Sequence, residues 1–322
     1  MFVRELEDGQ DLDVALLVRG AEVRSKRDGG DYLRLTLGDR TGAVAGILWD
    51  SPAAATAAAK VGAVLVVSGR YALHPRFGPQ ITVRSLRPAQ EAEYEIEDLL
   101  DGPLLSADRM ESDLRELLET VSNPHLGRLL DRFFGAGEPT WLEFREAPAA
   151  KYYHQAYRHG LLEHCLTVAQ AVRATAGTFP GVDGDLALAG ALLHDIGKLE
   201  AYLSDPRQID LTDAGKLEGE IPLGYYRVRR AIEELEGFPP DLAQALLHII
   251  LSHHGTLEHG SPVVPCTREA TLVHMIDNLG GRLGSFDRLE KELPDGQRWS
   301  GFDRALGGGA FFATSAAHVA SK

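Results

Sequence analysis

A histidine and an aspartate stand side by side at the end of the apolar run LAGALLHDIGK, as His194 and Asp195. Other apolar segments of the chain carry further side chains of the same two kinds, at His164, His253, His254 and Asp277. Imidazole and carboxylate groups are the ligands that borderline and hard divalent metals prefer. Placing them on apolar helix faces is costly unless a cation or hydrogen bonds compensate. The pattern therefore predicts a divalent-metal centre built from several helices.

Not every histidine in these segments belongs to such a centre. A lone histidine on a helix is more often a hydrogen-bonded interior residue than a ligand, so we interpret His248 and His274 as packing or capping residues. Cys165 follows a candidate ligand, and we interpret it as a small buried filler.

Helical periodicity surrounds the candidate ligands. Apolar residues recur at intervals of three and four from Ser106 to about Leu289. We expect an all-α domain over residues 125–293, preceded by a linker and leading helices over 91–124. The remaining residues, 294–322, show little pattern and are expected to form a flexible tail.

Residues 13–88 instead show the alternation that is typical of strands. Five apolar-alternating runs, with a short Ala-rich helix between the third and the fourth, predict the element order of an OB-fold. The fold class is therefore multidomain, with an all-β, OB-like five-stranded barrel over residues 1–90 and an all-α domain after it.

Several side chains of the barrel suit nucleic acid. Tyr32 and Arg34 alternate with Leu33 and Leu35, so we expect them on a solvent face where bases can stack beside a cation. OB-like barrels also bind proteins or sugars, so this assignment depends on the domain that follows. The candidate nucleic-acid-binding residues are Tyr32, Arg34, Trp49, Arg70, Tyr71, Arg76 and Phe77.

The charge of the chain is unevenly distributed. Its formal net charge is -14, yet residues 1–90 hold 12 Lys and Arg against 10 Asp and Glu, and the remainder holds 21 against 37. An acidic surface repels phosphate backbones, so a nucleic acid would need local positive charge or a bound metal. Two cysteines without CxxC spacing, and the lack of a signal peptide or a long apolar run, predict a cytoplasmic protein without a membrane partner.

The ordered set His164, His194-Asp195 and Asp277 resembles the H…HD…D signature of the HD phosphohydrolase superfamily. The phrases PAAKYYHQAYRHGLLEH, LAGALLHDIGK and LSHHG followed by MIDNL resemble one branch more closely, the YhaM-type 3'-5' exoribonucleases. Members of that branch join an N-terminal OB-fold to an HD domain. The resemblance covers roughly residues 13–289. It implies divalent-metal-dependent removal of nucleotides from the 3' end of RNA or single-stranded DNA.

The resemblance also implies roles for single residues. The first metal would be held by His164, His194, Asp195 and Asp277, and Asp195 would bridge to a second metal at His253 and His254. Where the family usually supplies a further histidine, this chain has Glu220. A carboxylate is a suitable ligand for manganese or magnesium, so Glu220 is a candidate replacement. The alternatives are a weaker second site or a single-metal enzyme.

Catalysis would follow from those ligands. A divalent metal activates water at neutral pH for attack on phosphorus, and two metals clamp an in-line displacement. Asp195 would be central to this chemistry, and Lys198 is placed to contact a non-bridging phosphate oxygen. His154 and Arg158 lie four residues apart, so on a helix they would share a face and hold a phosphate or protonate the leaving oxygen.

These features predict a metal-dependent phosphodiesterase, and specifically a 3'-5' exonuclease whose barrel holds RNA or single-stranded DNA. The expected cofactor is manganese, with magnesium, cobalt, iron or zinc as alternatives. Homo-oligomer formation stays open. Two other functions remain: an HD hydrolase of a nucleotide or cyclic dinucleotide, and a non-catalytic single-strand-binding protein.

Overall fold

The computed structural model describes residues 1–26, 29–50, 53–74, 77–100, 102–103, 105–150, 155–203, 209–293 and 296–313. The described residues form two compact units. The first runs from Met1 to Gly102, and the second starts at Pro103. Among the described residues, no helix combines the length and the apolar character that a membrane span requires.

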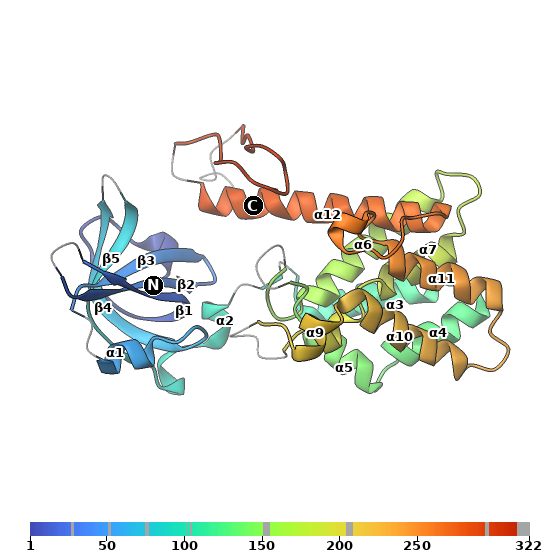
Figure 1. The fold of residues 1–322 in the computed structure, drawn as a ribbon, viewed down its shortest axis with the longest axis horizontal. Helices are drawn as coiled ribbons and strands as arrows, with labels where there is room; N and C mark the ends of the chain where they lie inside the picture. The colour runs from blue at the N-terminus through green and yellow to red at the C-terminus, as the bar shows by residue number, and fades with distance from the viewer. Residues whose placement is uncertain are drawn as a thin grey trace. The chain divides into compact units, whose positions relative to one another are not determined.

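The first unit is a closed five-stranded barrel, shown in blue and cyan in Figure 1. Its strands pair in the order β1-β2-β3-β5-β4, with β3 and β5 parallel and the other pairs antiparallel. The short helix α1 lies between β3 and β4 in the chain, which confirms the OB-like order. The elements are β1 (Asp11–Ser25), β2 (Asp31–Asp39), β3 (Gly42–Leu48), α1 (Ala53–Ala58), β4 (Val64–His74), β5 (Gly78–Pro88) and α2 (Ile96–Leu99).

Strand alternation builds the barrel interior. Leu33, Leu35 and Leu37 of β2 are buried in the interior cluster, while Arg34 between them is exposed. Successive side chains of a strand point to opposite faces, so the period-2 pattern of the sequence fixes which side of β2 meets solvent.

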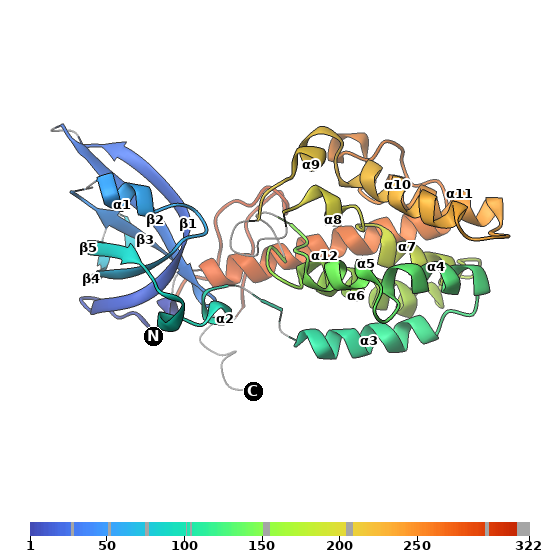
Figure 2. The same ribbon diagram turned by 90° about the horizontal axis from the view of Figure 1, so that it is seen from below.

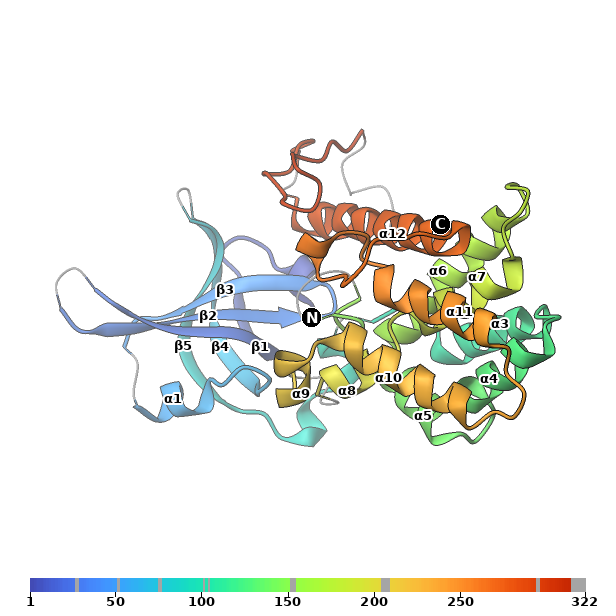
Figure 3. The same cartoon turned by 45° about the vertical axis from the view of Figure 1, so that its right-hand side comes forward.

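In the second unit, the regular elements of the described residues are helices, with isolated bridges besides. Helix α7 contacts α6, α11 and α12, and it lies beside α12 in Figure 2, while α10 packs along α11 (Figure 3). Its helices are α3 (Ala107–Glu119), α4 (Pro124–Phe134), α5 (Pro139–Glu146), α6 (Gly160–Ala176), α7 (Gly184–Leu193), α8 (Lys198–Ala201), α9 (Asp213–Leu217), α10 (Glu220–Glu233), α11 (Pro240–Ser252) and α12 (Arg268–Glu292).

The side chains of Asn123, Asp183 and Thr267 cap the first turns of α4, α7 and α12. Such caps satisfy amide groups that a helix leaves without partners, so they fix where each helix begins.

The chain after α12 carries some local order. Bridges join Trp299 to Phe311 and Asp303 to Gly308, and Ala310 and Phe312 pack against Leu289 of α12. The expected flexibility of the whole tail and the functional boundaries at residues 90, 124 and 293 stay predictions. The boundary between the two units, at Gly102, falls inside the segment that the sequence assigns to a linker.

Candidate metal centre

Helix α7 delivers the His-Asp pair to the interior of the second unit. Every residue of α7 from Leu186 to Leu193 is buried, so the helix has no polar face to turn toward solvent. His194 and Asp195 follow its last turn and are only 1% and 2% exposed. An apolar helix thus carries two polar side chains into the core, where they need partners.

The fold brings the other candidate ligands to the same point. The candidate ligands form three overlapping sets, and within each set the ligand atoms lie within 4.8 Å of one another. The sets are His164, His194 and Asp195; then His194, His253 and Asp277; and then Asp195, His253 and His254. His164 comes from α6, Asp277 from α12, and the pair His253-His254 follows α11. All six residues that the sequence groups together therefore meet at one place.

The distances show how tightly two of the rings converge. The Nε2 atoms of His164 and His194 are 3.1 Å apart, and each lies 3.2 Å from Oδ2 of Asp195. Oδ1 of Asp277 lies 3.2 Å from Nε2 of His164 and 3.8 Å from Nε2 of His194. Two imidazole nitrogens and two carboxylate oxygens thus face one small volume.

The opposite edge of each ring is fixed by an oxygen atom. Nδ1 of His194 donates to the carbonyl of Ala191 at 2.8 Å, and Nδ1 of His253 donates to that of Ile250 at 2.8 Å. A carbonyl can only accept, so Nδ1 carries the hydrogen and the neutral ring keeps its lone pair on Nε2. His254 is held in the same way, 2.9 Å from the carbonyl of His259. Metal-binding histidines are oriented by such bonds.

Two buried atoms of the cluster fit a cation. Among the described residues, Oδ1 of Asp195 and Nε2 of His253 make no hydrogen bond although both are buried, and they lie 3.5 Å apart. A buried polar atom without a partner is costly. A divalent cation would satisfy a carboxylate oxygen and an imidazole lone pair together, so the donor set fits such a cation.

The electrostatics point the same way. Burial alone would lower the pKa of His164, but hydrogen bonds to Asp195 and Asp277 outweigh it and raise that pKa to about 9. The pKa of Asp277 is lowered because His164 and the nearby His194 outweigh the effect of burial. The two carboxylates therefore favour positive charge at this point of the cluster.

Lys198 contacts this cluster directly. Its Nζ lies 2.7 Å from Oδ2 of Asp195, and the side chain is 13% exposed. Burial would lower the pKa of Lys198, but Asp195 raises it, so the ammonium stays charged. Glu220, the first residue of α10, has Oε1 3.9 Å from Nε2 of His254. It therefore lies at the edge of the cluster, beside the ring that the sequence assigns to a second metal.

The expected phosphate pair is not placed as the sequence suggests. His154 lies outside the described residues. Arg158 precedes α6, in a segment where Gln155 and His159 have positive φ angles, so the spacing of four residues does not put it on a helix face. Its guanidinium pairs instead with the carboxylate of Glu146.

A glutamine that sequence reasoning missed orients His164. Oε1 of Gln155 accepts from Nδ1 of His164 at 3.1 Å, and its amide nitrogen donates to Glu163 at 3.3 Å. The hydroxyl of Tyr157 donates to the same carboxylate of Glu163. Gln155 therefore does for His164 what backbone carbonyls do for the other rings. The sequence offers no periodicity by which to find a ligand partner in this turn.

Replacing Gln155 with alanine is expected to weaken divalent-metal binding about tenfold, because His164 loses the acceptor that orients its ring. Titration of the metal-free protein with manganese by isothermal calorimetry measures this. Gln155→Glu keeps an acceptor oxygen and should retain most of the affinity. Gln244→Ala, at an exposed position of α11, is the control. Unchanged affinity in Gln155→Ala would show that the contact does not orient a ligand.

The two histidines interpreted as packing or capping residues both make hydrogen bonds to the backbone. Nδ1 of His274 lies 2.7 Å from the carbonyl of His253, and Nε2 of His248 accepts from the amide of Cys266 at 2.8 Å. Cys165 is fully buried, which agrees with its interpretation as a filler.

The barrel residues divide into exposed and buried groups. The ring centroids of Tyr32 and Trp49 lie 5.1 Å apart with the planes tilted by 35°, Trp49 is 49% exposed, and Arg34 and Arg70 are exposed. Phe77 is 67% exposed and lies against His74. Arg76 lies outside the described residues. Tyr71 is 8% exposed and packs in the barrel interior, so its assignment to a base-stacking surface is wrong.

Comparison with known proteins agrees with this geometry. Residues 161–281 match the family described as HD domain. The 3'-5' exoribonuclease YhaM of Bacillus subtilis is 31% identical over 292 residues, which cover 90% of this chain and 91% of the relative. The protein of the same name from Geobacillus sp. (strain WCH70) is 31% identical over 291 residues, 89% of this chain and 88% of the relative. With its barrel, its HD domain and a likeness that spans both chains, this protein belongs to the YhaM family of 3'-5' exoribonucleases.

Proposed function

We propose that this protein removes nucleotides from the 3' end of single-stranded RNA, with manganese in the helical unit. The observation that carries the proposal is the convergence of imidazole Nε2 atoms on Asp195 and Asp277, with each Nδ1 held by an oxygen acceptor. The names of the curated relatives support the substrate and the direction of attack.

Asp195 has the central role in this proposal. Its Oδ2 faces His164 and His194, while its Oδ1 faces His253, so one carboxylate serves both sides of the cluster. Divalent cations supply the Lewis acidity that activates water and polarises a phosphoryl oxygen. We assign the first ion to His164, His194, Asp195 and Asp277, and a second to Asp195, His253 and His254, with Glu220 at its edge.

Lys198 supplies fixed positive charge next to this cluster. Its ammonium donates to Oδ2 of Asp195. We infer that it can also contact a phosphate oxygen of the strand, as a point charge that needs no particular geometry. Its burial shields this charge from solvent and so strengthens the interaction.

The barrel offers a surface for the strand. The half-buried ring of Tyr32 lies against the exposed ring of Trp49, and Arg34 extends from the same face of β2 as Tyr32. Stacking on aromatic rings beside a cation is how OB domains bind single strands without a strict sequence preference. We propose that this surface holds the RNA, and that single-stranded DNA is a weaker substrate.

Digestion of 5'-labelled RNA and DNA oligonucleotides tests the proposal. With manganese, we expect a ladder that shortens from the 3' end, faster on RNA than on DNA, and no products in EDTA. Intact RNA in every lane, or products that arise inside the strand, would overturn it.

One observation favours a different substrate. Residues after position 90 hold 37 Asp and Glu against 21 Lys and Arg, and such an excess suits a small nucleotide better than a long polyanion. A nucleotide or cyclic dinucleotide hydrolase would leave the oligonucleotides intact and cleave the small molecules in the same buffer.

A further inference from the structure

A cavity of about 870 Å³ lies in the helical unit, beside the metal centre. Its walls come from α4, α5, α8 and α10, and Lys198 is part of the lining. Because Nζ of Lys198 is 2.7 Å from Asp195, the cavity adjoins the centre through one side chain. The volume falls in the range of small-ligand pockets. The metal centre does not account for this cavity, since none of its proposed ligands lines it.

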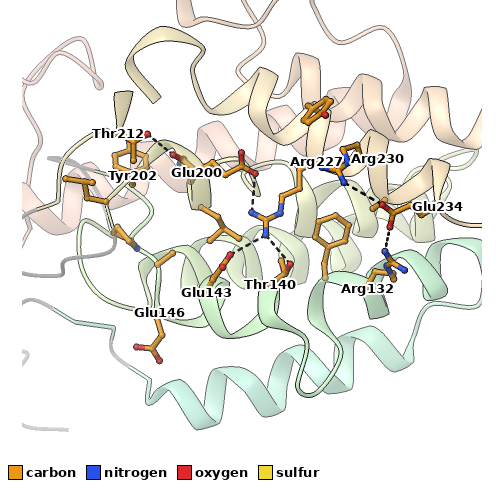
Figure 4. A pocket seen from close by; sticks show the side chains of 18 residues that line it. Arg132, Thr140, Glu143, Glu146, Glu200, Tyr202, Thr212, Arg227, Arg230 and Glu234 are labelled. Atoms are coloured by element: carbon orange, nitrogen blue, oxygen red, sulfur yellow. Dashed lines mark hydrogen bonds and ion pairs between the residues drawn. The ribbon is translucent and has the colours of Figure 1, made fainter. Parts of the chain in front are cut away.

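Arg227 lies in the middle of the cavity, between Glu200 on one side and Glu143 and Thr140 on the other (Figure 4). Its guanidinium nitrogens are 3.4 Å from Glu200, 3.3 Å from Glu143 and 3.1 Å from Thr140 Oγ1. The two carboxylates are 47% and 59% exposed, so these ion pairs are weak. A phosphate oxygen can therefore replace a carboxylate at the guanidinium.

An exposed aromatic ring completes the lining. Tyr226 precedes Arg227 on α10 and is 60% exposed, with the guanidinium of Arg230 5.9 Å from its ring centroid. An exposed tyrosine ring with a cation nearby is a suitable platform for a nucleobase.

The charges of the cavity are balanced. Four cations line it, and so do four carboxylates: Arg132, Lys198, Arg227 and Arg230 with Glu143, Glu146, Glu200 and Glu234. A groove that tracked only phosphates would carry an excess of cations. Carboxylates next to arginines suit a ligand that has hydroxyl and amino donors as well as a phosphate, and a ribonucleotide is such a ligand.

We propose that this cavity binds one ribonucleotide unit of the strand, next to the phosphodiester that is cleaved. Tyr226 stacks on the base, Arg227 and Arg230 contact phosphate oxygens, and Glu143 or Glu200 accepts from the sugar hydroxyls. The proposal rests on the proposed function, because it takes the strand to end at the metal centre. It adds a binding site whose residues are not metal ligands.

Two pairs of variants test it. Tyr226→Ala is matched by Phe179→Ala, which removes an aromatic ring of 57% exposure from outside the cavity. Arg230→Ala is matched by Arg229→Ala, the neighbouring arginine of α10 that pairs with Glu233 and does not line the cavity. Each is assayed with manganese on an RNA oligonucleotide and on bis(4-nitrophenyl) phosphate, a small diester without a base or sugar.

We expect Tyr226→Ala and Arg230→Ala to lower kcat/KM on RNA about tenfold, mainly through KM, because stacking and phosphate contacts are lost. The loss on the small diester should be several times smaller. The two control variants should match the wild type on both substrates. Equal losses on both substrates would indicate a structural role, and no loss on RNA would also overturn the proposal.

A binding measurement distinguishes failure of this proposed site from failure of the proposed function. In the Asp195→Asn background, a fluorescein-labelled ribotrinucleotide should bind, and adding Tyr226→Ala should weaken that binding about tenfold in fluorescence anisotropy. If the wild type does not shorten RNA but this difference appears, the proposed function fails and the site stands. If the Asp195→Asn protein does not bind the ribotrinucleotide, or if Tyr226→Ala does not weaken that binding, the proposed site is overturned. Tyr226-dependent binding of AMP, with RNA kinetics unchanged in Tyr226→Ala, would make it a free-nucleotide site and overturn the assignment to the strand.

Discussion

Replacing Asp195 with asparagine is expected to abolish metal-dependent phosphodiester hydrolysis, with a loss of about a thousandfold or more. Asparagine keeps the shape of the side chain but removes the negative charge that faces His164, His194 and His253. One of its two terminal atoms would also become a donor, which cannot bind a cation. Removal of a group that acts in the transition state commonly costs this much. His194→Ala should lose as much.

The experiment needs a carboxylate that is equally structural but distant from the centre. Asp185, in the first turn of α7, accepts from the amides of Ser122 and Asn123 and pairs with Arg173. Asp185→Asn should lower stability and leave hydrolysis near the wild-type rate. Activity on bis(4-nitrophenyl) phosphate and thermal unfolding by circular dichroism are measured for both variants. An active, folded Asp195→Asn protein would exclude the proposed centre.

Replacing Gly197 with alanine is expected to destabilise the helical unit by about 3 kcal/mol or more. A Cβ atom there would lie 2.0 Å from the carbonyl oxygen of Glu220 and 2.4 Å from the amide of Gly224. Both are backbone atoms, so α10 would have to move away as a whole. The φ of Gly197 is -68°, which alanine adopts easily, so the expected loss is steric and not conformational.

Gly127→Ala is the matched control for this substitution. Gly127 lies within α4, and no heavy atom would lie within 4 Å of an added Cβ. Alanine should stabilise that helix by about 0.5–1 kcal/mol. Urea unfolding followed by the helical circular dichroism signal gives both values. If Gly197→Ala is as stable as Gly127→Ala, α10 does not pass as close to Gly197 as the structure places it.

The parts of the site that sequence could predict are those that depend on local pattern. The apolar runs around His164, His194 and Asp277 predict buried helices, and ligand residue types on such helices predict that they meet. Period-2 alternation likewise predicts the interior of the barrel. Tyr71 could have been predicted as buried by the same rule, since it follows Leu65 and Val67 at even spacing.

Other parts depend on tertiary contacts that no local pattern encodes. Gln155 reaches His164 from a turn with a left-handed φ, which sequence reasoning assigned to a helix. The cavity joins Thr140, Glu200 and Arg227, which are far apart in the chain and meet only because α5, α8 and α10 pack together. Ion pairs between residues so far apart in the sequence can be identified only after the helices have been positioned in three dimensions.

The positions of His194 and His253 at the C-caps of α7 and α11 have an electrostatic consequence. The aligned peptide dipoles of a helix leave a partial negative charge at its C-terminal end. Two such ends meet at the cluster, so the backbone itself attracts a cation before any side chain coordinates it. A substitution that frays the last turn of either helix should therefore weaken metal binding while leaving every ligand in place.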